Sequence, residues 1–432
     1  MKLLLKGGRV VDPRNRLDGT MDVLIEAGKI VSVGAGTDAP TGTGEIDEID
    51  ARGKLVLPGL IDMHVHLREP GREDEETIET GTLAAVRGGF VAVACMPNTD
   101  PPIDTAAAVS FVRSRARECG HARVLPVGAI TKGCDGAELA EIGELSRAGA
   151  VAISDDGRPV ASSRIMRYAM EYASTFGLPV ISHSEDLELS AGGAMNEGYW
   201  STRLGLPGIP AAAEEIMVAR DIILAELTGA RLHIAHVSTA GSVELVRRAK
   251  ERGAAVTCEV TPHHLALTDE AVAGYDTNTK VNPPLRSRRD VEALRAGLLD
   301  GTIDAVASDH APHTREEKEV EYELAAPGMI GLETSLPVVF TELVKPGVLT
   351  LQQLVDKMSY GPARILGLDW PGIVPGACAN LTLLDPDASF VVDPAAFASA
   401  SRNTPFAGRR LSGKVVATIV DGVLSFDART AA

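Results

Sequence analysis

The chain has few aromatic side chains and no long apolar run, and both absences narrow its class. Phe, Trp and Tyr make up 4% of the 432 residues although 45% are hydrophobic, so the core must rest on aliphatic side chains. Such cores are typical of parallel strands and of the helices that cover them. No apolar stretch reaches the roughly 18 residues of a membrane span, so we expect no membrane association. The first apolar run ends at Lys6, is too short for a signal peptide, and predicts an edge strand.

Basic residues are outnumbered, and the cysteines are scattered. Lys and Arg number 42 against 59 Asp and Glu, which gives a net charge of -17. Such a surface repels phosphate backbones, so we expect no nucleic-acid partner, and an anionic small-molecule substrate would need local cations.

The five cysteines form no CxxC pair. A disulfide scaffold is therefore not expected, and a reducing, cytoplasmic location is.

Phosphate-binding loops of the GxGxxG or GxxxxGK[ST] type are also missing after the apolar segments, which weakens the case for a nucleotide-binding function.

The middle of the chain contains an alternation of short apolar segments with helix-like stretches. The predicted strands are 55–65, 89–96, 124–131, 150–155, 178–183, 231–237, 256–262 and 304–309. This alternation indicates a parallel sheet, and so many units in this length fit a closed β/α barrel better than an open sheet.

The two ends of the chain show a different pattern. Period-two alternation with Gly-rich turns appears near the start, in LLLKGGRVVD, and near the end, in KVVATIVDGVLSF, without a clear helix. Chain termini often lie close together. We therefore expect one small β domain formed by residues 1–56 and 367–432, and a barrel formed by residues 57–366.

Most predicted barrel strands end in a polar side chain capable of chemistry. In a barrel enzyme these ends converge on one mouth, where the active site lies. The residues at these ends are His64, His66, Asn98, Asp155, Asp156, His183, His236, Asp309, His310 and His313.

The histidines at these ends suggest metal binding. His64 and His66 are two apart on a strand and therefore face the same side, as a pair of zinc ligands would. His183 and His236 could hold a second ion, and a carboxylate between the two ions would bridge them. A lone histidine of this kind is more often structural, so the case depends on the whole set. We interpret His233 as structural.

For several other residues the sequence allows two possible roles. Asp309 could ligate a metal and move a proton, or it could cap a helix. Arg68 has the planar fork that suits a carboxylate, or it could form a surface ion pair with Glu69 or Glu73. His263 and His264 are ambiguous, with a structural role favoured, and Asp155 is read as a turn residue.

Two long strings carry a family resemblance. DMHVHLREPG (62–71) and ASDHAPHTREEK (307–318) resemble the two signatures of dihydroorotases, and CMPNT, SDDG, HSED, HVST, TPHHL, KVNPPLR and APGMIGLET appear in the expected order along the chain. Over its whole length the chain is similar to the bacterial class I dihydroorotases of the amidohydrolase superfamily. The resemblance implies an α/β fold, namely a distorted (β/α)8 TIM barrel with a small β-sandwich domain formed by both chain ends.

The resemblance also implies two zinc ions per chain and the side chains that bind each ion. His64, His66 and Asp309 would hold the first ion, His183 and His236 the second, and Asp156 would bridge them. Relatives such as hydantoinases use a carboxylated lysine instead, for which Lys132 is the nearest rival here. The implied substrate-binding residues are His66, Arg68, Asn98, Asn282, His313, Pro327 and Gly328.

The implied reaction is the reversible cyclisation of N-carbamoyl-L-aspartate to L-dihydroorotate, in pyrimidine (UMP) synthesis, with Asp309 as the catalytic proton shuttle. Rival activities are those of dihydropyrimidinase, hydantoinase and allantoinase, whose substrates lack the carboxylate that Arg68 would bind. A further rival is a non-catalytic partner of aspartate transcarbamoylase, but such relatives usually lose metal ligands, and all six are present here. A homodimer and an enzyme that needs aspartate transcarbamoylase for full activity remain open.

Overall fold

The apolar segments in the middle of the chain form a ring of short parallel strands. The protein is described by a computed structural model that covers residues 2–36 and 46–430. Within these residues, the strands of the ring are β6 (Leu60–Val65), β7 (Phe90–Cys95), β8 (Arg123–Ala129), β9 (Ala152–Ser154), β10 (Val180–Ser182), β13 (Leu232–Ile234), β14 (Val256–Val260) and β15 (Ala305–Val306). A bridge between Val65 and His310 joins the two ends of this sheet. The predicted β/α barrel is confirmed.

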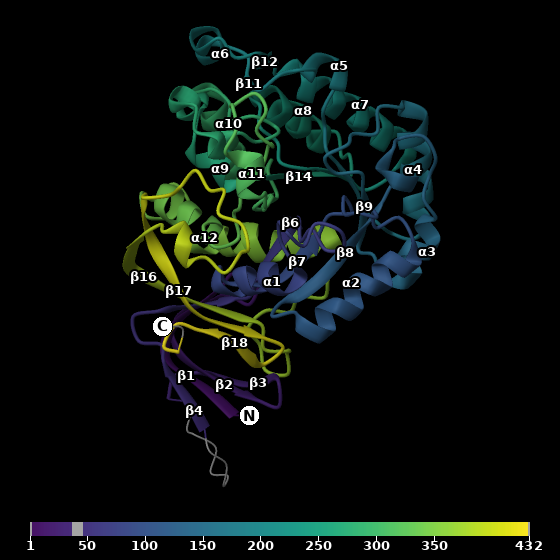
Figure 1. Cartoon of the computed structure of the whole chain (residues 1–432). Coiled ribbons are helices and arrows are strands. Elements are labelled where there is room, and N and C mark those ends of the chain that lie inside the picture. Colours follow the sequence, from purple (N-terminus) through teal and green to yellow (C-terminus); the bar gives the residue numbers. More distant parts are fainter. Residues whose placement is uncertain (1, 37–45, 431–432) are drawn as a thin grey trace.

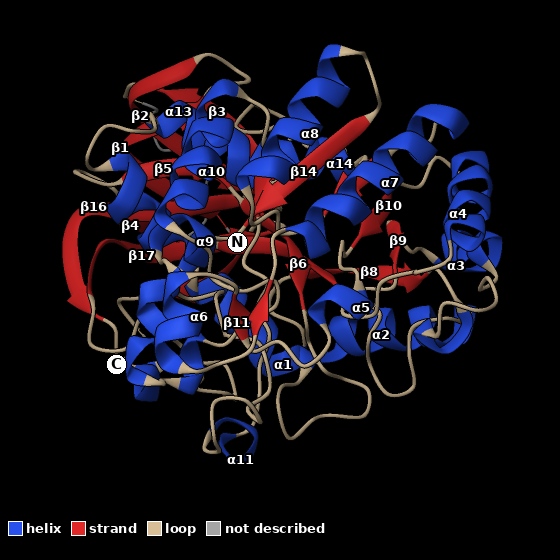
Figure 2. Cartoon of the chain, turned by 90° about the horizontal axis from the view of Figure 1, so that it is seen from above, coloured by secondary structure: helices blue, strands red, loops and turns tan. Residues whose placement is uncertain are grey.

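Amphipathic helices cover the outside of the ring, as α3 and α4 do for β9 and β10 in Figure 2. In α4, Ser162 accepts a hydrogen bond from the amide of Ile165 and so caps the helix, whose buried residues recur at helical spacing. The helices that follow barrel strands are α1 (Ile78–Arg87), α2 (Ala106–Cys119), α3 (Ile142–Ala148), α4 (Ser163–Thr175), α7 (Ala212–Thr228), α8 (Ala240–Glu251), α10 (Arg288–Asp300) and α14 (Gly361–Leu366).

Shorter elements fill the connections. They are α5 (Leu187–Ser190), β11 (Met195–Asn196), α6 (Tyr199–Leu204), β12 (Gly208–Ile209), α9 (Pro262–Ala266), α11 (Arg315–Lys318), α12 (Ser335–Val339) and α13 (Leu351–Val355). Among the described residues, no helix combines the length and the apolar character that crossing a membrane would require.

Small side chains line the inside of the barrel and close its floor. Met63, Ala94 and Ala152, from three different strands, belong to one buried cluster together with Ile365 and Leu366 of α14. This packing fills the inside of the barrel. The polar residues that follow the strands lie at the carboxyl ends of the strands.

Strands from both chain ends form one further sheet, which lies below the barrel in Figure 1. In sheet order, its members are β18 (Val423–Asp427), β17 (Arg410–Val420), β16 (Leu381–Val391), β5 (Leu55–Pro58), β1 (Lys2–Asp12), β2 (Leu17–Glu26) and β3 (Lys29–Gly34), with β4 (Ile46–Asp50) also paired to β1. The common β unit expected from the two ends is therefore present. Its division from the barrel at residues 56/57 and 366/367 stays a prediction.

The first strand is not at an edge, so that part of the sequence analysis was wrong. β1 lies between β5 and β2 and pairs in parallel with β4 along its first half. Leu3, Leu4 and Leu5 are all buried. A continuous apolar run of this kind is typical of a strand that is covered on both faces rather than an edge strand.

The predicted strand 55–65 is in fact two strands that belong to different sheets. The break is at Gly59, whose amide donates to the carbonyl of Asn380 at 2.8 Å. A Cβ at this position would lie 2.5 Å from the side chain of Val91. Only glycine lets the backbone pass this closely, and here the chain crosses from the small sheet into the barrel.

Candidate metal centre and active site

The six candidate metal ligands meet at the mouth of the barrel. Each of them lies on a barrel strand near its carboxyl end or within three residues after it. All six are buried, with at most 6% of their surface exposed. They are His64 and His66 at β6, Asp156 after β9, His183 after β10, His236 after β13 and Asp309 after β15.

Asp156 lies in the middle of the four histidines. Its Oδ1 is 3.2 Å from Nε2 of His64 and 3.6 Å from both Nδ1 of His183 and Nε2 of His236. Its Oδ2 is 3.4 Å from Nε2 of His66. Burial opposes ionisation of this carboxyl group, but attraction to His64 and bonds to the other imidazoles hold its pKa well below the ordinary value. One carboxylate thus lies within 3.6 Å of nitrogens of all four histidines.

Two of the clusters at this mouth that could hold a metal ion contain the candidate ligands. His64, His66 and Asp309 form one, and His64, Asp156 and His236 form the other, with the potential ligand atoms of each within 4.8 Å of one another. His183 lies beside the second cluster, with its Nδ1 3.0 Å from Nε2 of His236.

The clusters also leave polar atoms that a cation would satisfy. Nε2 of His64 and Oδ1 of Asp156 are buried, and neither has a hydrogen bond of acceptable geometry to a described residue. Buried polar atoms without partners are rare and call for an explanation, such as an ion. Imidazole and carboxylate together are ligands that zinc and other divalent metals accept. The donor set therefore fits a metal centre.

Backbone strain is concentrated around the same mouth. Arg68, His236 and Asp309 have φ angles of 58°, 33° and 49°, in the left-handed region that side chains disfavour. Each such residue costs about 1–3 kcal/mol and persists only where the surroundings impose it. Strained backbone of this kind clusters at functional sites.

A buried carboxylate beneath His64 escaped the sequence analysis. Oε1 of Glu259, on β14, lies 2.6 Å from Nδ1 of His64. Its Oε2 lies 3.3 Å from Nε2 of His233, whose Nδ1 contacts Oγ1 of Thr257 at 2.9 Å. Burial raises the pKa of Glu259, but attraction to His64 and His233 outweighs it and lowers the value to about 2. The only signal in the sequence is an acidic residue inside an apolar strand.

Glu185 was also missed, although it follows His183 in the string HSED. Its Oε2 lies 3.1 Å from Nε2 of His183 and accepts a hydrogen bond from Nδ2 of Asn282 at 2.9 Å. The carboxylate therefore joins a candidate metal ligand to a candidate substrate ligand. It also leaves Nδ1 of His183 facing Asp156.

Arg68 lies half-buried at the same mouth, with 13% of its side chain exposed, and has a partner that the sequence analysis did not name. Its Nε lies 2.8 Å from Oε2 of Glu75 and donates to the carbonyl of Pro312 at 3.1 Å. The alternative interpretation of Arg68, a surface ion pair with Glu69 or Glu73, is therefore not what the described residues show. Glu69 instead binds Arg115 at 2.7 Å.

The other predicted substrate residues are held by specific contacts. Oδ1 of Asn98 lies 2.8 Å from Nδ1 of His66. His313 places Nδ1 3.1 Å from Glu75 and Nε2 3.0 Å from the carbonyl of Pro327. Gly328 has a φ of 144°, and a Cβ there would lie 2.8 Å from Nε2 of His313. Segments far apart in the sequence thus meet around His313.

The structure also tests the alternative roles that the sequence suggested for Lys132, Asp155 and His264. Lys132 is exposed and pairs with Glu138 at 2.5 Å, so it does not lie among the candidate ligands. Asp155 begins a turn, as expected, because its backbone carbonyl accepts the amide of Arg158, and its carboxylate also accepts the distant amides of Ile130 and Thr131. His264 contacts Thr261 and the carbonyl of Pro283, which fits a structural role.

His263 is buried in α9 beside His264. Its Nε2 is buried and has no hydrogen-bond partner among the described residues. Burial and the neighbouring His264 lower its pKa well below the ordinary value, which favours a neutral ring.

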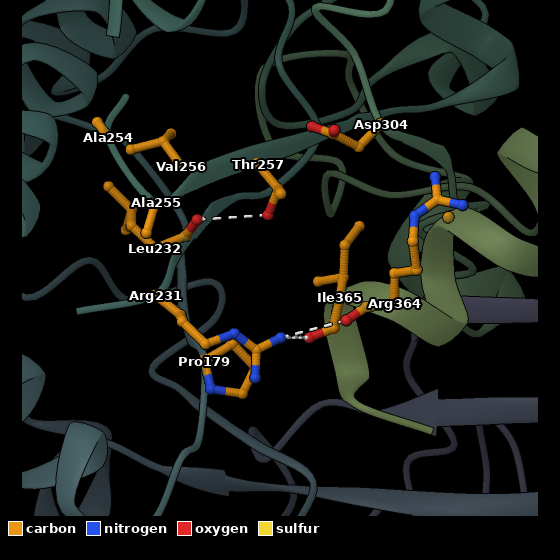
Figure 3. A pocket seen from close by; sticks show the side chains of 11 residues that line it. Pro179, Arg231, Leu232, Ala254, Ala255, Val256, Thr257, Asp304, Arg364 and Ile365 are labelled. Atoms are coloured by element: carbon orange, nitrogen blue, oxygen red, sulfur yellow. Dashed lines mark hydrogen bonds between the residues drawn. The ribbon is translucent and has the colours of Figure 1, made fainter. Parts of the chain in front are cut away.

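A pocket of about 310 Å³ lies at the opposite end of the barrel (Figure 3). It is lined by residues that precede or begin barrel strands, such as Pro179, Arg231 and Asp304. Arg231 donates to the carbonyl groups of Gly177 and Ile365. Because its polar groups are already bonded and the candidate ligands lie at the other end, this pocket is not the active site.

Comparison with known proteins agrees with this geometry. The structure resembles an L-hydantoinase (dihydropyrimidinase) from Arthrobacter aurescens with a TM-score of 0.88 at 28% identity, covering 98% of this chain and 96% of that one. A dihydropyrimidinase from Brevibacillus agri gives a TM-score of 0.85 at 25% identity, with 98% and 95% covered. The fold and the cluster of histidines and aspartates define a metal-dependent hydrolase of cyclic amides, in the amidohydrolase superfamily.

The sequence comparisons narrow this class. A family model described as dihydro-orotase-like matches residues 53–242. A dihydroorotase of Pelotomaculum thermopropionicum is 61% identical over 422 residues, which is 98% of each chain. One from Acetivibrio thermocellus is 56% identical, with 97% of this chain and 98% of that protein covered. The chain belongs to the dihydroorotase family, and its function is that of a dihydroorotase rather than of a dihydropyrimidinase.

Proposed function

We propose that the chain uses two zinc ions to interconvert N-carbamoyl-L-aspartate and L-dihydroorotate. In this proposal one ion is held by His64, His66 and Asp309, and the other by His183 and His236. Asp156 would bridge both ions. The observation that carries the proposal is the position of the Asp156 carboxylate, whose oxygens lie 3.2–3.6 Å from nitrogens of all four histidines.

Zinc at this centre would lower the pKa of a water molecule and polarise the ring amide carbonyl. In the hydrolytic direction, Asp309 then accepts the proton of the attacking water and gives it to the ring nitrogen as the C–N bond breaks. The location of Asp309 supports this role, since it is buried and its Oδ1 lies 3.2 Å from Nε2 of His66. Burial opposes ionisation of Asp309, but the bond to His66 and the nearby histidines lower its pKa, so the carboxylate is ionised before the reaction.

The remaining residues would bind the substrate. We propose that Arg68, Asn98 and His313 bind its carboxylate, with Asn282 and the backbone of Pro327 and Gly328 around the ring. Arg68 offers a planar pair of donors that matches a carboxylate. A half-buried cation at this place also offsets, locally, the net charge of -17 that would otherwise repel an anionic substrate.

A comparison of three substrates tests the proposal that dihydroorotate is the ring that the enzyme hydrolyses. The purified, zinc-loaded chain is assayed with L-dihydroorotate, dihydrouracil and allantoin under the same conditions. The proposal predicts that kcat/KM for dihydroorotate exceeds that for the two rings without a carboxylate by orders of magnitude. Faster turnover of dihydrouracil or allantoin would contradict it.

Location and partners belong to the proposal as well. A cytoplasmic location is supported by the five cysteines, all free in the structure. The family resemblance supports a homodimer and a partnership with aspartate transcarbamoylase. Sedimentation of the chain alone and activity with added aspartate transcarbamoylase test these two points separately.

A further inference from the structure

One buried carboxylate joins the two side chains that we assign to the substrate's carboxylate. Oε2 of Glu75 lies 2.8 Å from Nε of Arg68, and Oε1 lies 3.1 Å from Nδ1 of His313. Only 2% of the Glu75 surface is exposed. Glu75 precedes α1, whereas His313 follows β15, so a single side chain ties two distant segments of the barrel mouth together.

The contacts of Arg68 leave its fork available. The shortest approaches of the guanidinium to its two partners, Glu75 and the carbonyl of Pro312, are both through Nε. The two terminal nitrogens form the face of the group that binds a carboxylate in bidentate fashion. Holding the side chain by Nε therefore fixes its direction without using that face.

His313 is held from both sides. Its Nδ1 faces Glu75, its Nε2 faces the carbonyl of Pro327, and its amide donates to Oδ1 of Asn403 at 3.3 Å. Glu75 is itself fixed, because its carbonyl accepts a hydrogen bond from Oγ of Ser401 at 2.7 Å. The arrangement therefore has little freedom to change when a ligand enters.

We propose that Glu75 is a positioning residue that sets the specificity for anionic ring substrates by holding Arg68 and His313 in their carboxylate-binding arrangement. This inference rests on the proposed function, in which those two residues bind the substrate. Glu75 is an acidic side chain beside the place that the proposal assigns to the substrate's carboxylate. If charge alone mattered, its removal would strengthen binding, and if positioning matters, its removal weakens binding. The sign of the effect therefore distinguishes the two roles.

The test compares Glu75→Gln with Glu75→Asp and with the matched control Glu73→Gln. Glu73 lies on the same segment, is exposed, and contacts the amide of Gly71. Gln keeps the shape of Glu75 but can accept a hydrogen bond through only one oxygen, and Asp keeps the charge but withdraws it by one methylene. The measurements are kcat and KM for L-dihydroorotate, the same constants or the inhibition constant for its uncharged methyl ester, and zinc content.

For both Glu75 variants we expect KM for dihydroorotate to rise about tenfold or more, which is the size of effect that misplaced binding groups produce. We expect kcat to change less than threefold, and binding of the ester and zinc content to stay as in the wild type. Glu73→Gln should match the wild type throughout.

Three results would overturn the inference: a lower KM in Glu75→Gln, an equal loss for acid and ester, or a wild-type KM in Glu75→Asp. If Glu75→Gln fails to fold, Glu75→Asp alone decides the matter through the ratio of acid to ester. Failure of the wild-type chain to hydrolyse dihydroorotate would instead contradict the proposed function.

Discussion

Replacing Glu259 by Gln tests how the protein prepares His64 for metal binding. Oε1 of Glu259 lies 2.6 Å from Nδ1 of His64, and both side chains are buried. The carboxylate faces Nδ1, so Nε2, which lies 3.2 Å from Asp156, is the nitrogen that would hold a metal ion. Gln has almost the same shape as Glu, so the variant removes the charge and leaves the packing in place.

The expected effect follows from two independent estimates. A residue that orients a ligating histidine typically contributes about 10- to 100-fold to metal affinity, which corresponds to about 1.4–2.8 kcal/mol. The loss of one hydrogen bond to a charged group costs about 1.5–3 kcal/mol. The two estimates agree. The full cost of the lost bond applies because Glu259 and His64 are too deeply buried for water to replace it.

The assay is competition for zinc between the protein and a chromogenic chelator at fixed pH. We predict that Kd for zinc rises about 10- to 100-fold in Glu259→Gln. Glu333→Gln is the control, since Glu333 is a mostly buried carboxylate that accepts the amides of Ala398 and Ser399 instead. Zinc affinity within twofold of the wild type in Glu259→Gln, or an equal loss in Glu333→Gln, would refute the reasoning.

Three further predictions concern the substrate site and stability. Arg68→Lys keeps the charge but loses the planar fork, so KM for dihydroorotate should rise about tenfold or more at unchanged zinc content; an unchanged KM in steady-state kinetics would exclude the assigned role. Gly328→Ala places a Cβ 2.8 Å from Nε2 of His313 at a φ of 144° and should lower both kcat/KM and the thermal midpoint, the latter through about 1–3 kcal/mol of strain; wild-type values for both would contradict this. Burial raises the pKa of Glu333 from 4.5 to about 7, so the folded state keeps a proton that the unfolded state releases, and stability should fall as the pH rises between these values. In urea unfolding, Glu333→Gln should remove this part of the slope, and identical pH dependences would show that the shift is absent.

The sequence predicted the barrel because its strands are short apolar runs between amphipathic helices, a pattern that local residue order carries. It could not separate β5 from β6. Both are apolar, and the break depends on how closely Gly59 passes Val91 and Asn380, which is a tertiary contact. The position of β1 inside the sheet also depends on tertiary contacts. We interpreted β1 as an edge strand because its own sequence does not show that β4 and β5 pair with it.

Among site residues, those at strand ends could be found from the sequence because topology alone brings them to one mouth. His64, Asp156 and His236 are of this kind. The carboxylates that orient them could not be found in this way. Glu259 lies within a strand and Glu75 before a helix, and each acquires its role only from the side chain that folding places opposite it.

The most direct test of the account is the zinc content of the wild-type chain and of Asp156→Ala, measured by elemental analysis together with the rate of dihydroorotate hydrolysis. If Asp156 bridges two ions, the wild type should hold about two zinc ions per chain. The variant should then hold clearly fewer and lose its activity. A variant that keeps the wild-type zinc content and the full rate would contradict the binuclear centre on which the account depends.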